Sequence, residues 1–343
     1  MTYFIDSKRP RTSVWILPLL LGATACSPYS FSSEVASISN GVDKMAESFS
    51  SGYDGLAGDL ATTKQVEMAA KRQRILLAGA CDDEVDARRS NTAVCGLYIA
   101  GTSEPELTSL QLTQAQTMRS VRVLKKYANA LAAVTNAADR TAYDAAVGQL
   151  SGAVATVTAS ANLAAPGAGM IAPAAVNVFG WVVGTALDQQ RYDSLRTAVN
   201  RVGQPLPDKE NPNPRSPIRV VTGTLGMGLS QLTNARIGAL TREAGILTIG
   251  LSSRPLSDEA YRKQLAEAWA AAATAEALRR SDPQGAAADL ADAHDKLVEA
   301  VNEPGRSYGS LLKAVGEFGE KISALHTAMT AANSPSTTSK KGQ

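Results

Sequence analysis

The sequence predicts an all-α fold, arranged as an elongated multi-helix bundle with a central uncharged helical hairpin. Apolar residues recur at steps of three or four along several long stretches, which is the spacing of one helix face. Pairs such as Ser216-Pro217 and Asp282-Pro283 are typical of helix starts. No Asn-Gly or Asp-Gly pair is flanked by the alternating apolar runs of a β-hairpin. The chain has 343 residues, 44% of them hydrophobic, and is therefore long enough to build a large core.

The first bundle segment is expected at 35–202. Its opening helix has an apolar stripe that begins at Val35 and continues to Leu60, and we expect the helix to run on to Leu77. A second helix is expected from Ser103 to Ala138, because Ser103-Glu104-Pro105-Glu106 has the pattern of a capping box with proline in the first turn. Helices of this length are typical of a bundle.

Residues 145–187 form a stretch of 43 residues without Asp, Glu, Lys, Arg or His. Pro166-Gly167 divides it into arms at 145–165 and 170–187, which predicts a helical hairpin. We expect this hairpin to be buried in the bundle. Insertion into a membrane is the alternative, because the arms just reach the length that a bilayer requires. The candidate membrane or partner contacts lie on the second arm and are Val178, Phe179, Trp181, Val182 and Val183.

The second half of the chain is expected to be a further part of the bundle, at 218–333. A proline-rich linker or surface loop at 203–217 precedes it. Four helices are predicted, at 220–251, from Ser257 to Leu278, from Asp282 to an interruption at Pro304-Gly305, and from Tyr308 to Met329. The polar residues 334–343 are predicted to be a disordered tail.

The first 26 residues have the three parts of a secretory signal: a basic start, the apolar run 14–21 and small residues up to Cys26. The segment Leu21-Gly22-Ala23-Thr24-Ala25-Cys26 resembles the lipobox of bacterial lipoproteins, with Ala23 where that pattern prefers Leu. The resemblance implies a signal peptide at 1–25, cleavage before Cys26 and acylation of this cysteine, with a polar tether at 26–34. Ala23-Thr24-Ala25 also fits an ordinary signal-peptidase site, which would release a secreted soluble protein.

The residue after the cysteine is Ser27, which is similar to the outer-membrane sorting signal of Gram-negative lipoproteins. The resemblance therefore implies an exported protein on the outer membrane, facing the periplasm or the cell surface. Several acyl chains, such as palmitate, would make the attachment effectively permanent. Removal of residues 1–25 would leave 31 basic and 31 acidic residues, which argues against electrostatic recruitment to the membrane.

Two further cysteines, Cys81 and Cys95, remain as a pair in an oxidising compartment, and we predict a disulfide between them. The polar segment 82–91 between them is expected to be a surface loop that the bridge pins between two helices. A redox role would require the C-x-x-C spacing, and a metal site would require more ligands nearby.

No residue pattern indicates a catalytic, cofactor or metal site. On a helix, His294 shares its face with Leu290, Leu297 and Val298, so we expect a histidine at the polar boundary of the core. The glycines at 223–228 lack the Lys-Ser/Thr of a phosphate-binding loop, and no G-x-S-x-G elbow is present. The sequence predicts no cofactor and gives no indication of a small-molecule substrate.

The function predicted from the sequence is that of a lipid-anchored, non-enzymatic helical scaffold that binds other proteins. With 34 basic and 32 acidic residues, the chain has no excess charge that would attract nucleic acid. The alternative is a membrane-active, pore-forming-like protein that inserts the hairpin 145–187. A hydrolase whose site is assembled from distant residues is the third hypothesis, which only a pocket with converging titratable groups would favour.

Overall fold

The computed structural model describes residues 31–71, 75–78, 96–99, 109–164, 186–205, 215–253 and 255–333. Long helices make up nearly all of these residues, so the predicted all-α bundle is confirmed. In chain order the elements are α1 (Ser32–Lys71), β1 (Ile75–Ala78), β2 (Gly96–Ile99), α2 (Ser109–Thr135), α3 (Arg140–Ala164), α4 (Leu187–Gly203), α5 (Pro217–Ser253), α6 (Asp258–Arg280), α7 (Pro283–Asn302) and α8 (Pro304–Ala331).

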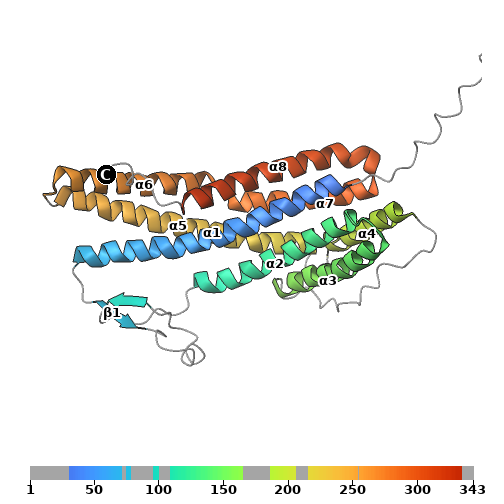
Figure 1. Cartoon of the computed structure of the whole chain (residues 1–343), viewed down its shortest axis with the longest axis horizontal. Helices are drawn as coiled ribbons and strands as arrows, with labels where there is room; N and C mark the ends of the chain where they lie inside the picture. Colours follow the sequence, from blue (N-terminus) through green and yellow to red (C-terminus); the bar gives the residue numbers. More distant parts are fainter. Residues whose placement is uncertain are drawn as a thin grey trace, which may run out of the picture.

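The bundle is elongated, and its helices run roughly along its long axis (Figure 1). Helix α5 is central, because it packs against α1, α2, α3, α4, α6 and α7. Helix α8 packs against α1 and α7, and α2, α3 and α4 pack against one another. The buried side chains of all eight helices form one continuous core, which includes Leu56, Leu124, Leu150, Val199, Leu229, Leu278, Leu297 and Phe318.

The beginning of α1 is fixed by an aromatic cluster. Phe31, which directly precedes the helix, is buried, and its ring lies 6.3 Å from that of Tyr192 and 6.1 Å from that of Tyr308. The Tyr308 hydroxyl donates a hydrogen bond to Oε1 of Glu34 at 2.7 Å. These contacts join the first turn of α1 to α4 and α8. The predicted polar tether at 26–34 is therefore wrong for its last residues, because α1 begins at Ser32 and both Phe31 and Glu34 are buried.

Side-chain caps begin two of the helices whose starts were predicted, at Ser257 and Asp282. The Ser257 hydroxyl accepts a hydrogen bond from the backbone N–H of Ala260, and the Asp282 carboxylate accepts one from the N–H of Gly285. Both bonds satisfy backbone donors that a first helical turn leaves without a partner. The predicted interruption at Pro304 is also confirmed, because α7 ends at Asn302 and α8 begins at Pro304.

Glycines in the middle of α5 allow its neighbours to approach closely. A Cβ at Gly228 would lie 2.7 Å from Cβ of Thr117 in α2, and one at Gly226 would lie 3.0 Å from Cβ of Ala287 in α7. Such contacts outweigh the low helix propensity of glycine, which costs about 1 kcal/mol relative to alanine. The stretch 220–251 is therefore part of one continuous helix that begins at Pro217.

The prediction that the first helix extends to Leu77 is wrong. Helix α1 ends at Lys71, and Ile75–Ala78 forms a strand that pairs antiparallel with Gly96–Ile99, in the register Ile75↔Ile99 and Ala78↔Gly96. A short apolar run fits a strand as well as a helix, and the pairing partner lies far along the chain. The segment that contains Cys81 and Cys95 therefore lies between two strands in the sequence. The prediction that it connects two helices directly is wrong.

The remaining helix boundaries also differ from the predictions. Helix α2 ends at Thr135, before the predicted Ala138, whereas its predicted start at Ser103 lies outside the described residues. Helix α8 begins one turn before Tyr308. Helix α4 occupies a polar stretch for which no helix was predicted. The first arm of the uncharged stretch lies within α3, which also includes the charged residues Arg140 and Asp144 and buries Leu150, Val154 and Val157 in the core. Within the described range this arm is thus a core helix.

Candidate functional site

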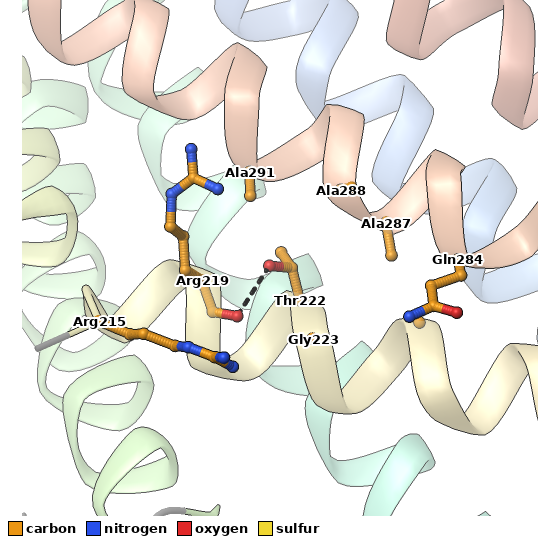
Figure 2. A pocket seen from close by; sticks show the side chains of 9 residues that line it. Arg215, Arg219, Thr222, Gly223, Gln284, Ala287, Ala288 and Ala291 are labelled. Atoms are coloured by element: carbon orange, nitrogen blue, oxygen red, sulfur yellow. Dashed lines mark hydrogen bonds between the residues drawn. The ribbon is translucent and has the colours of Figure 1, made fainter. Parts of the chain in front are cut away.

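A cavity of about 330 Å³ lies between α5 and α7, close to the start of α5. Small residues on both helices leave this space open. Figure 2 shows two polar side chains, Arg215 and Gln284, at opposite ends of the cavity. The full lining consists of Arg215, Arg219, Thr222, Gly223, Gly226, Gln284, Ala287, Ala288 and Ala291.

Two of the four polar side chains that line this cavity, Arg219 and Thr222, have partners in the protein. Nε of Arg219 donates to Asp295 at 2.8 Å, and its Nη2 donates to Asp292 at 2.7 Å. The Thr222 hydroxyl donates to the carbonyl oxygen of Ile218 at 2.8 Å, with a second contact to that of Arg219 at 3.4 Å (Figure 2). Arg215 is exposed at the cavity rim. The lining contains no carboxylate, histidine or cysteine, so none of these residues supplies a general base that could activate the Thr222 hydroxyl.

His294 lies on α7, about one turn after Ala291 of the cavity lining. Its side chain is buried, so the predicted position at the polar boundary of the core is wrong. Its Nε2 lies 2.9 Å from the hydroxyl of Tyr127 in α2, at hydrogen-bond distance. Burial, together with the charge of Arg219, lowers the pKa of His294 to about 3. The imidazole is therefore neutral near pH 7, and the pair joins α2 to α7 without carrying charge.

A second buried polar group, the side chain of Arg236, joins α5 to α1 and α8. Arg236 in α5 is completely buried, and its Nε donates to Asp59 in α1 at 2.9 Å. Its Nη1 and Nη2 donate to the carbonyl oxygens of Met329 and Ala332, at 3.3 and 3.2 Å, at the end of α8. Burial raises the pKa of Asp59, and Arg236 opposes this shift. The guanidinium group thus binds three helices together.

An exposed apolar row on α6 has no role in the core. Tyr261, Leu265 and Trp269 are 44%, 43% and 76% exposed, and they follow one another at intervals of four residues. Side chains at this spacing lie on the same face of a helix. We call these three residues the α6 row.

The site residues predicted from the sequence lie outside the described residues. This holds for Cys26, for the pair Cys81 and Cys95, and for the five residues of the second hairpin arm (178, 179, 181, 182 and 183). Acylation and the disulfide therefore stay predictions. The Tyr127–His294 pair, the Arg236–Asp59 pair and the α6 row were not predicted. Only the row had a sequence signal, its four-residue spacing.

Within the described part of the chain, none of the helices combines the length and the apolar character needed to span a bilayer. The same residues contain no group of three or more His, Cys, Asp or Glu side chains that could hold a metal ion. Comparison with known proteins gave no matching family model, no matching curated protein and no matching solved structure.

Proposed function

We propose that this protein is a membrane-anchored lipoprotein whose helical body acts as a scaffold that binds proteins. The lipobox-like segment ending at Cys26 supports the anchor. The helical body begins at Phe31, shortly after this cysteine. An acylated Cys26 would therefore lie only five residues before Phe31 and the start of α1, which runs through the bundle.

The observation that carries the scaffold role is the exposure of the α6 row. An aromatic residue as exposed as Trp269 leaves a large apolar surface in water, and an isolated exposed residue would need no explanation. Here three apolar side chains are aligned on one face. Exposed apolar patches mark interaction sites, and tryptophan and tyrosine are enriched among the residues that dominate binding energies.

The anchor is tested by cell fractionation of a Cys26→Ser variant of the full chain. We expect this variant to leave the membrane fraction, because the acyl chains supply the attachment. A Cys81→Ser/Cys95→Ser variant serves as the control and should stay with the membrane. Retention of Cys26→Ser in the membrane fraction, or an unmodified mature amino terminus in mass spectrometry, would contradict the proposal.

The scaffold role is tested by crosslinking in intact cells. Wild-type protein should form crosslinked species that a Trp269→Ser variant loses. Leu312→Ser is the matched control, because Leu312 is 49% exposed on α8, outside the α6 row. The role is refuted if wild-type protein forms no crosslinked species at all.

Membrane insertion of 145–187 is the competing function. The lack of charge in this stretch favours it, whereas the packing of α3 opposes it. Insertion would require α3 to leave a core in which Leu150, Val154 and Val157 are buried. The scaffold role requires no such rearrangement.

A further inference from the structure

We propose that the partner of the α6 row is a second copy of this chain, bound with its α6 antiparallel to the first and with Trp269 on the two-fold axis. This inference rests on the proposed scaffold function and names its partner. Helix α6 lies at the outer edge of the bundle, beside α5 (Figure 1). Among the described elements it packs against α5 and, less extensively, against α8, and the side chains of the α6 row stay exposed.

Four charged residues of α6 are arranged symmetrically about Trp269. Arg262 precedes it by seven residues and Glu276 follows it by seven, whereas Asp258 precedes and Arg280 follows it by eleven. At about 3.6 residues per turn, seven and eleven residues are close to two and three turns. All four side chains therefore lie on the same face as Trp269.

This symmetry makes the face complementary to itself. In an antiparallel pair centred on Trp269, residues at equal distances before and after it face each other. Arg262 of one copy then faces Glu276 of the other, and Asp258 faces Arg280, so each pair of copies has four favourable contacts. In a parallel pair each charge would face its own kind, which is destabilising. A two-fold interface requires such self-complementarity.

The ion pairs that these residues form within one copy do not prevent them from pairing with a second copy. Glu276 lies 3.1 Å from Arg280 and 3.7 Å from Arg279, and the three side chains are between 48% and 78% exposed. Exposed pairs of this kind contribute less than about 1 kcal/mol each. Asp258 and Arg262 have no ion pair among the described residues. Both are thus available to a partner.

The same charge pattern argues against a lipid surface as the occupant. Helices that lie on membranes have a polar face rich in Lys and Arg, which attracts anionic lipids. The α6 face has as many acidic as basic residues in these four positions, so it has no net attraction to such a surface. Small residues such as Ala272, next to the row, would let a second helix approach closely.

A mixing experiment with two charge-reversed variants tests the inference. Full-length Arg262→Glu and Glu276→Arg proteins are purified in detergent, and dimer formation is followed by sedimentation. Within each variant, residues 262 and 276 of the two copies repel each other, so we expect its dissociation constant to rise at least about tenfold. In the mixture both contacts are opposite in sign, so heterodimers should form with wild-type affinity. Detergent micelles and lipid anchors are the same in every sample. Dimers that form in the mixture and not in either variant alone can therefore be explained only by direct pairing of residues 262 and 276.

Two further variants test the position of the axis. Trp269→Ala should weaken the dimer by at least about 30-fold, the size expected for a central interface residue, whereas Leu312→Ala should leave it unchanged.

The inference is overturned if wild-type protein is monomeric at about 100 μM, or if mixing the charge-reversed variants restores no dimer. Cellular crosslinks of the row to a different protein would also overturn it, while leaving the scaffold role intact. A lack of any crosslink would refute both.

Discussion

Replacement of Gly55 by alanine is expected to destabilise the bundle, whereas the same change at Gly58 is expected to stabilise it. Both glycines lie in α1, three residues apart. A Cβ at Gly55 would lie 2.5 Å from both Cζ and Nη2 of Arg236, which is far inside van der Waals contact. A Cβ at Gly58 would meet no atom within 4 Å.

The expected size of the effect follows from the surroundings of Arg236. Its side chain is completely buried and cannot turn into solvent, so the clash would displace it from Asp59 and from two carbonyl oxygens. Breaking a buried ion pair costs about 3–5 kcal/mol, and the higher helix propensity of alanine returns about 1 kcal/mol. Gly55→Ala should therefore lower the free energy of unfolding by about 2–4 kcal/mol, and Gly58→Ala should raise it by up to about 1 kcal/mol.

Urea unfolding followed by circular dichroism measures both changes. The midpoint of Gly55→Ala should fall and that of Gly58→Ala should rise relative to wild type, with similar slopes. A Gly55→Ala protein as stable as wild type would refute the conclusion that the contacts of Arg236 with α1 and α8 stabilise the bundle.

Three other predictions concern pH, the cysteines and the membrane. The folded-state pKa of His294 is about 3 against an ordinary 6.5, so the folded state binds fewer protons between these values. Stability should therefore fall as the pH drops from about 6.5 towards 3, and His294→Gln should remove up to roughly 5 kcal/mol of this dependence in urea titrations; an unchanged pH profile would contradict this. Peptide mapping without reductant should find Cys81 joined to Cys95, and free thiols at both would refute the bridge. Wild-type protein should release no dye from liposomes; leakage that Val178→Asp abolishes would favour membrane insertion instead.

The parts of the fold that local chemistry determines were predictable from the sequence. The caps at Ser257 and Asp282 bond to backbone groups three residues away, so their function is contained in the sequence around them. Pro304 ends one helix and begins another for a similarly local reason. Long apolar stripes likewise identified α1, α2 and α8.

The parts that depend on distant contacts could not be predicted in this way. The strand at Ile75 depends on pairing with Ile99, and the burial of His294 depends on Tyr127 in another helix. The exposure of Trp269 was also hidden, because its spacing from Tyr261 and Leu265 would suit a core stripe equally well. Only the position of α6 at the edge of the bundle distinguishes the two cases.

The burial of Phe31 limits how far the bundle can move from a bilayer. If Cys26 carries acyl chains, only the five residues from Cys26 to Ser30 separate the lipid from the fixed Phe31–Tyr192–Tyr308 cluster. Even fully extended, this segment measures less than about 20 Å. The end of the bundle that contains the turn between α7 and α8 would then stay within about 20 Å of the lipid. Protein partners would have to approach from the side of the bundle or from its opposite end.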